Sequence, residues 1–184
     1  MSRQFWGETL AWATADGTAV ANSTTETIIF PNVTIPANYL QDGRSLRLTL
    51  FGKHSTTATP TLTFRVRFGG VAGTVLAASG AITCATVTNA AFKLDITLTV
   101  RSNGSTGTVM ANGEATVYGG TAPTVGSATG APGIGPMTAG GQTAPATATV
   151  DLTADTALSV TAQWSAASAS NTLTGTNYLV ESLN

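Results

Sequence analysis

Charged residues are scarce in this sequence. Only 9% of its 184 residues are charged, whereas about 25% is usual for a soluble domain. The formal net charge is −1, and the chain contains just 8 lysines and arginines. It therefore has no positive field that would attract phosphates or an anionic lipid surface. We expect neither a nucleic-acid partner nor a membrane partner.

Cysteine, histidine and long apolar runs are scarce as well. One cysteine, Cys84, excludes an intrachain disulfide framework. One histidine, His54, lies in a polar stretch (52–56) that we interpret as a surface turn, and His with Cys alone cannot form a structural zinc site. No run approaches the roughly 20 apolar residues of a membrane span. The N-terminus lacks the apolar region of a signal peptide. We expect no metal, no cofactor and no N-terminal signal.

The acidic residues are scattered singly, and only two of them are predicted to be neighbours. Asp95 and Glu114 lie on adjacent predicted strands, which leaves a paired-carboxylate glycosidase as an alternative. Both share a polar face with Lys93, so cross-strand charge pairing is the favoured interpretation. The residues therefore indicate a protein without catalytic residues, and we expect no enzyme activity.

Basic residues gather at one predicted place. Arg47, Arg65 and Arg67 are expected on one face of two neighbouring strands. Eight basic residues are too few for a groove that follows a phosphate backbone. This pattern favours a protein–protein contact or a ladder of paired charges.

Apolar and polar residues that alternate with a period of two are abundant. They alternate in 45–53, 61–68 and 92–101, which is typical of strands with one buried face. We expect hairpins at 91–118, around Asn103-Gly104, and at 157–183, with a third at 10–21. No window has a sustained helical period. The sequence predicts an all-β fold, an antiparallel jelly-roll-like β-sandwich of about eight strands.

The chain divides into two parts by composition. Residues 1–40 form an N-terminal segment that is a possible contact arm, and 41–184 form the β-sandwich domain. That domain contains a loop at 119–147, rich in Gly, Ala and Pro, which is either an arm across a neighbouring subunit or a flexible insertion. The candidate partner-contact residues are the bulky or charged residues of these two segments: Arg3, Phe5, Trp6, Trp12, Ile134 and Met137.

Three segments together resemble the small structural proteins of tailed-bacteriophage virions: 45–70, 91–118 and 157–183. The resemblance lies in the general character of these segments and in their order along the chain. It covers roughly the C-terminal three quarters of the chain. It implies a jelly-roll-like fold, a place in the virion and assembly in the cytoplasm of the bacterial host. It implies no catalytic residues.

Three functions follow as hypotheses. The leading one is a capsid decoration (cement) protein, a homotrimer that binds and stabilises the shell of the major capsid protein by burying surface across its joints. The first alternative is a tail, fibre or spike component with a host-contact sandwich. The second is a carbohydrate-binding β-sandwich, in which Trp12 or Trp164 would stack on a sugar.

Overall fold

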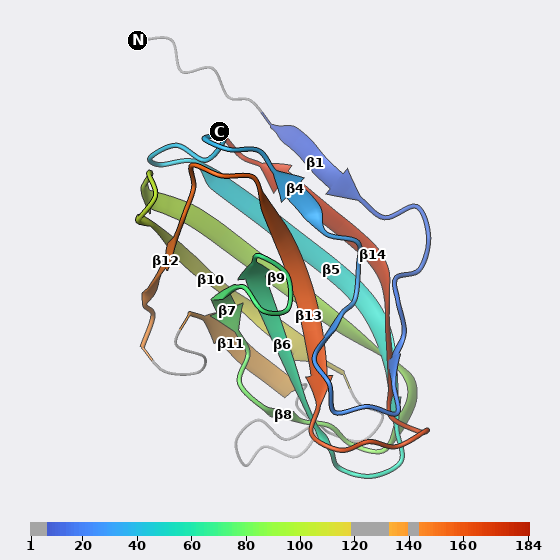
Figure 1. The fold of residues 1–184 in the computed structure, drawn as a ribbon. Helices are drawn as coiled ribbons and strands as arrows, with labels where there is room; N and C mark the ends of the chain where they lie inside the picture. Colours follow the sequence, from blue (N-terminus) through green and yellow to red (C-terminus); the bar gives the residue numbers. More distant parts are fainter. Residues whose placement is uncertain (1–6, 119–132, 140–143) are drawn as a thin grey trace.

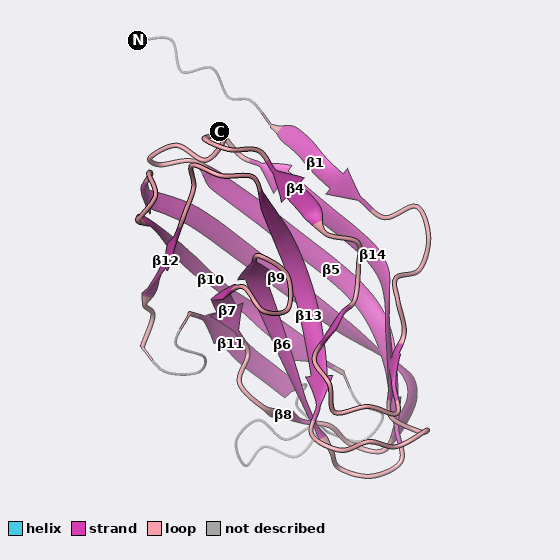
Figure 2. Ribbon diagram, viewed as in Figure 1, coloured by secondary structure: helices cyan, strands magenta, loops and turns pink. Residues whose placement is uncertain are grey.

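The chain is built from strands that curl into a single sheet. The computed structural model describes residues 7–118, 133–139 and 144–184, and none of these is helical (Figure 2). Their strands form one 14-stranded antiparallel sheet, which curls until its two halves face each other (Figure 1). The predicted all-β antiparallel fold is confirmed, although the strands outnumber the expected eight. No helix in the described part of the chain could span a membrane.

The strands have the following bounds. They are β1 (Glu8–Trp12), β2 (Val20–Ala21), β3 (Thr27–Ile28), β4 (Val33–Ile35), β5 (Ser45–Thr56), β6 (Thr61–Phe68), β7 (Thr74–Ala78), β8 (Ile82–Thr83), β9 (Val87–Ser102), β10 (Gly107–Val117), β11 (Gly133–Thr138), β12 (Thr147–Val150), β13 (Thr156–Trp164) and β14 (Thr172–Ser182). Along the sheet their order is β1-β14-β5-β9-β10-β11-β7-β6-β13-β3. The remaining short strands attach beside this path, with β2 on β14, β4 on β13, β8 on β6 and β12 on β10.

The core fills the space between the two halves of the sheet. Strands β14, β5, β9 and β10 form one wall, and β6 and β13 with β3 and β4 form the other (Figure 1). The period-two pattern points alternate side chains inward, so Phe64 of β6 stacks on Phe92 of β9 across the core, with ring centroids 5.2 Å apart. A buried side chain of this size contributes about 2–3 kcal/mol through the hydrophobic effect.

Two glycines make room for aromatic rings between the halves. A β-carbon at Gly52 would clash with the ring of Phe92, and one at Gly175 would clash with the ring of Phe30. Both glycines lie inside long strands, where glycine costs stability. The close approach of the rings is the reason that glycine occupies these positions.

The strand pairing confirms one predicted hairpin and contradicts two. β9 and β10 pair around Asn103-Gly104, and Gly104 has the positive φ (103°) expected of this turn. β13 pairs with β6 while β14 pairs with β5, so 157–183 crosses from one half of the sheet to the other. β1 pairs with β14 and not with β2, so 10–21 is no hairpin either. Alternation shows which face of a strand is buried, but it does not specify the neighbouring strand.

The N-terminal segment (1–40) and the loop (119–147) both contribute strands to the sheet. β1 and β2 lie on β14, while β3 and β4 lie on β13. β11, within the predicted loop, pairs with β10, and Met137 is buried in the core of this chain. The prediction that Met137 contacts a partner is therefore wrong, because its side chain fills its own core. Of the loop predicted at 119–147 as an arm or a flexible insertion, residues 119–132 and 140–143 lie outside the described residues.

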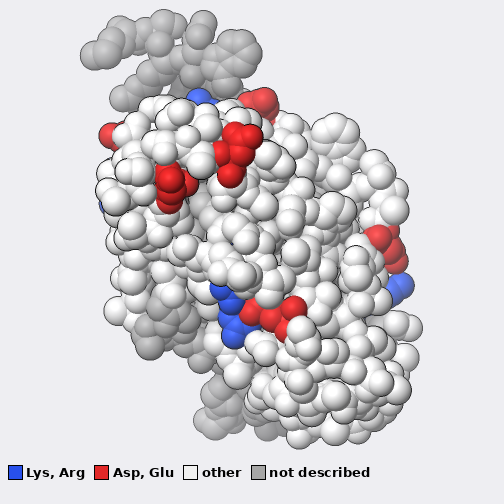
Figure 3. Space-filling view, in the orientation of Figure 1, with Lys and Arg blue, Asp and Glu red and all other residues white. Residues whose placement is uncertain are grey.

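The predicted arginine cluster does not form, because β5 and β6 belong to different halves of the sheet. Arg47 on β5 pairs with Asp95 of β9 at 3.3 Å. Arg65 and Arg67 on β6 both bind Glu26, with N–O distances of 3.1 and 2.7 Å. In Figure 3, blue and red groups adjoin near the middle and at the right edge of the face shown, and further red groups lie near its top. These three arginines are therefore paired with carboxylates of the same chain.

We predict that Glu26→Gln lowers the free energy of unfolding by about 3 kcal/mol, because it leaves two largely buried guanidinium groups without their carboxylate. Burial raises the pKa of Glu26, but the hydrogen bonds from Arg67 and Thr161 and the two positive charges outweigh it and leave the pKa below 4.5. This contribution is present above pH 4.5 and is lost as the pH falls through the lowered pKa.

Urea unfolding at pH 7 and pH 3.5 checks this prediction. Glu114→Gln, at an exposed glutamate, is the matched control and should change stability by less than about 0.5 kcal/mol. Equal stability of Glu26→Gln and Glu114→Gln at pH 7 would contradict the role given to Glu26.

His54 is buried inside β5, so its prediction as a surface-turn residue is wrong. It lies between Ala90 of β9 and Leu173 of β14 in the register of the sheet. Its Nδ1 hydrogen-bonds the carbonyl oxygen of Ala90 at 3.1 Å, and its Nε2 has no hydrogen-bond partner in the described part of the chain. Burial lowers the pKa of His54, and the hydrogen bond to Ala90 only partly offsets this.

We predict that acid destabilises the protein through His54. Below pH 6.5 the histidine of the unfolded chain binds a proton, whereas the buried imidazole of the folded chain stays neutral. The free energy of unfolding therefore decreases as the pH is lowered, by at most about 1.4 kcal/mol per pH unit. Unfolding measured between pH 7.5 and 5.5 should show this slope in the wild type and a flat line in His54→Leu, because the chain has 1 histidine. If the slope persists in His54→Leu, the pH dependence comes from another titrating group and the prediction is wrong.

Candidate binding site

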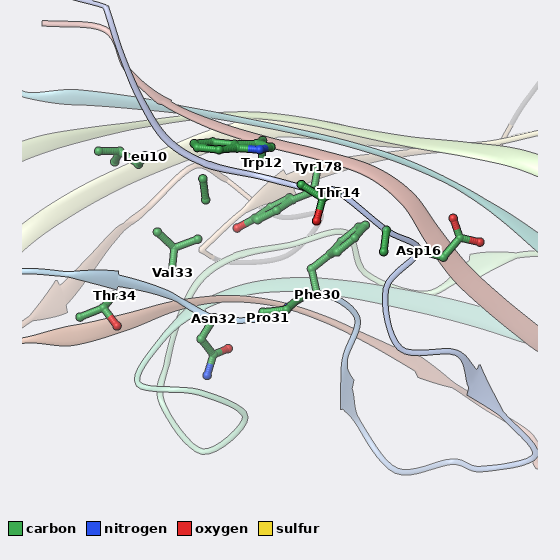
Figure 4. Close-up of a pocket in the computed structure, with 13 residues that line it drawn as sticks. Leu10, Trp12, Thr14, Asp16, Phe30, Pro31, Asn32, Val33, Thr34 and Tyr178 are labelled. Carbon is green, nitrogen blue, oxygen red and sulfur yellow. The ribbon is translucent and has the colours of Figure 1, made fainter.

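The curled sheet of described strands leaves an open seam where its two ends meet. β1 and β2 form one end, and β3 and β4 form the other. Between them lies a cleft of about 380 Å³, termed the seam cleft (Figure 4). Its lining comes from residues 10–16 on one rim, residues 30–34 on the other, and Tyr178 of β14. Three segments far apart in sequence therefore build one concave surface.

Two stacked aromatic rings hold the ends of the sheet together inside this seam. Phe30 precedes β4, and its ring lies 5.1 Å from that of Tyr178, with an interplanar angle of 12°. Both side chains are buried. Burial raises the pKa of Tyr178 further above neutral pH. Its hydroxyl is a tyrosine O–H that can donate a hydrogen bond. In Figure 4 this ring lies between Trp12 and Val33, so its hydroxyl is part of the cleft.

Trp12 separates the seam cleft from a second hollow. Its side chain is 65% exposed, more than any other large hydrophobic residue that the structure describes. The second hollow, termed the sheet cleft, has a volume of about 340 Å³ and lies on the outer face of β14 and β5. Phe51, which is 43% exposed, lines it together with Thr49 and Asn177. The indole thus forms a wall shared by two adjacent hollows.

The remaining lining of the seam cleft combines small apolar residues with short polar side chains. Thr14, Asn32 and Thr34 line the seam cleft. The carbonyl oxygen of Asn32 accepts a hydrogen bond from the hydroxyl of Ser159 at 2.7 Å, which fixes the orientation of this amide. Hydroxyl and amide groups at the rim of an apolar hollow supply the directional contacts of a small-molecule site.

The charges near the two clefts are matched in pairs. Asp95 binds Arg47 at 3.3 Å and Lys93 at 3.0 Å, which confirms the predicted charge pairing for this residue. Burial raises the pKa of Asp95, but the hydrogen bonds from Arg47 and Lys93 outweigh it and lower the pKa below 3.8. Glu114 lies directly opposite Asp95 and is exposed. A general acid needs a raised pKa, so Asp95 is unsuited to that role.

None of the other predicted site residues that the structure describes lines the seam cleft or the sheet cleft. Arg3, Phe5 and Trp6 lie outside the described residues, and Ile134 lies on β11 with a side chain that is not described. Trp164 is buried, and its indole N–H donates to the carbonyl oxygen of Val20 at 3.3 Å, so it cannot stack on a sugar. Of the predicted contact residues that are described, Trp12 is the one found at a cleft.

Sequence reasoning missed Phe30 and Phe51. Phe51 carried a signal, because it is a large apolar residue on the polar phase of β5, whose inward residues are Leu46, Leu48 and Leu50. Phe30 carried none, since it has the character of an ordinary core residue until the two ends of the sheet are brought together.

Reactive and metal-binding groups do not gather at the clefts. Cys84 is buried, and burial raises the pKa of its thiol to about 12. Within residues 7–118, 133–139 and 144–184, no group of three or more His, Cys, Asp or Glu side chains could hold a metal ion.

We predict that Trp12→Ala changes the free energy of unfolding by less than about 1 kcal/mol, because the indole is mostly in solvent. Phe30→Ala should cost about 3–5 kcal/mol, since it empties the stacked pair that joins the ends of the sheet. Chemical denaturation of both variants checks this contrast. A loss for Trp12→Ala as large as that for Phe30→Ala would make Trp12 a structural residue.

Comparison with known proteins yields no match in sequence and a weak structural similarity. No protein-family profile and no curated protein matches the sequence. Among solved structures, the chain is similar to the CBM2 module of the evolved Dit of Lactobacillus casei BL23 phage J-1. The similarity covers 99% of both chains at 12% sequence identity, with a TM-score of 0.36. A TM-score this low carries no argument about the fold or function of this chain.

Proposed function

We propose that this chain is a non-catalytic, jelly-roll-like recognition module of a bacteriophage tail, whose seam and sheet clefts bind the host surface. The observation that carries the proposal is Trp12, which is 65% exposed between two hollows. A large aromatic side chain kept in solvent gives up its hydrophobic stabilisation unless a partner covers it. The resemblance of three segments to virion proteins supports its place in a phage particle.

The shape of the site favours the tail alternative over the cement hypothesis. A cement protein acts through broad contact surfaces of about 800 Å² or more on each partner. The cement hypothesis relied on an N-terminal arm and a loop arm, and the described strands of both segments are paired within the sheet of this chain. A pair of concave hollows with an aromatic wall suits a small, repeated surface ligand. The capsid partner and the homotrimer stay predictions.

We predict that fluorescently labelled protein binds intact cells of at least one strain in a panel of bacteria, and that Trp12→Ala weakens this binding at least about tenfold. Tyr118→Ala is the matched control, because Tyr118 is 46% exposed and lines neither cleft. Flow cytometry at increasing protein concentrations measures the apparent affinity. Immunogold labelling of the particle should place the chain on the tail.

Two results would overturn the proposal. One is equal cell binding by the wild type and Trp12→Ala. The other is an absence of cell binding together with tight binding to bare capsids and a raised disruption temperature, which would restore the cement hypothesis.

A further inference from the structure

We infer that the seam cleft and the sheet cleft together bind a neutral, linear glycan that crosses Trp12 with sugar rings on both sides of the indole. This inference rests on the proposed function and names its ligand. The two clefts share Trp12 and Tyr178 in their linings, so they are adjacent parts of one surface. A ligand that fills both must be long enough to pass over the indole.

The aromatic side chains suit the apolar faces of sugar rings. Trp12 borders both hollows, and Phe51 adds a second exposed ring in the sheet cleft. Flat aromatic faces of this kind offer large contact area with little loss of side-chain entropy. Volumes of about 380 and 340 Å³ lie at the lower end of the range for small-molecule sites. Each hollow therefore suits one or two sugar rings, and a longer chain has to use both.

The polar groups of the clefts match sugar hydroxyls. Thr14 and Thr34 line the seam cleft, Thr49 and Asn177 line the sheet cleft, and Tyr178 borders both. A hydroxyl or amide group can both donate and accept hydrogen bonds, as a sugar hydroxyl does. A site of this composition recognises an uncharged polyhydroxylated ligand without needing any ionic partner.

The charge balance argues against an anionic glycan. Asp16 of the seam cleft pairs with Lys53 at 3.8 Å. Arg47 of the sheet cleft binds Asp95 and faces Glu181 in the strand register. Arg47, the arginine among the described lining residues of these clefts, therefore has carboxylates nearby. A sialylated, uronic or phosphate-bearing chain would have to displace one of these carboxylates, whereas a neutral chain displaces none.

The rims of the seam also argue against an added peptide strand. Strand addition needs a regular row of backbone N–H and C=O groups at an edge. β1 has an irregular register between Thr9 and Ala11, and such bulges blunt an edge against pairing. The opposite rim contains Pro31, which has no backbone N–H to donate. Neither rim therefore offers a continuous ladder.

The test uses polysaccharide released from the cells that the labelled protein binds. Anion-exchange chromatography divides it into a neutral and an anionic fraction, and protease treatment of the same cells releases a peptide fraction. Each fraction then competes with cells for the labelled protein. We expect the neutral fraction to abolish cell binding, while the anionic and peptide fractions leave it unchanged.

Chain length tests whether both clefts are used. Neutral oligosaccharides of increasing length, prepared from the competing fraction, are titrated by calorimetry. We expect affinity to rise at least about tenfold between the shortest and the longer oligomers and then to level off. Phe51→Ala should remove this rise and keep the affinity for the shortest oligomer, Trp12→Ala should remove binding at every length, and Tyr118→Ala should change neither.

The outcomes separate this inference from the proposed function. Competition by the anionic or the peptide fraction overturns the neutral glycan, and an affinity independent of length overturns the shared use of both clefts. In each of these cases, cell binding lost in Trp12→Ala still supports the recognition module. Cell binding that is insensitive to Trp12→Ala overturns both.

Discussion

The stacking of Phe30 on Tyr178 is the contact on which the open seam depends. It joins the two ends of the curled sheet through side chains, where a closed barrel would use a ladder of backbone hydrogen bonds. The rings seal the core at this point while the backbones of β1 and β4 stay apart. Gly175 is part of the same arrangement, because a β-carbon there would push the ring of Phe30 away. A sheet that closed fully would have no seam cleft.

The position of Trp12 follows from this arrangement. β1 is held on β14, and the hydrogen bond from Ala13 N–H to the Tyr178 carbonyl oxygen, at 2.9 Å, continues that pairing past Trp12. Glu8, at the start of β1, accepts a hydrogen bond from the Tyr39 hydroxyl at 2.7 Å. The strand that carries Trp12 is thus fixed along its length. A preorganised aromatic wall loses little entropy when a ligand covers it.

The sequence predicts the local features of this protein better than its long-range ones. Strict alternation was enough for an all-β fold and for the hairpin of β9 and β10, because the turn at Asn103-Gly104 brings neighbouring strands together. The crossover from β13 to β14 was not predictable. Both strands have an apolar inward face, and this pattern is the same whichever strand lies beside them. For the same reason Glu26 gave no sign of binding Arg65 and Arg67, and His54 looked exposed. In the candidate site, Trp12 was predicted from the sequence and Phe51 carried a signal there, whereas the stacking of Phe30 on Tyr178 depended on the meeting of distant segments.

The central claim is that the seam around Trp12 is a recognition surface. Backbone-amide NMR tests it most directly, with the protein titrated against polysaccharide released from cells that it binds. The account predicts that the amide resonances that shift belong to residues 10–16, 30, 32–34, 177–179 and 181, together with Thr49 and Phe51. Shifts confined to β10 and β12, at the distant side of the sheet, would contradict it.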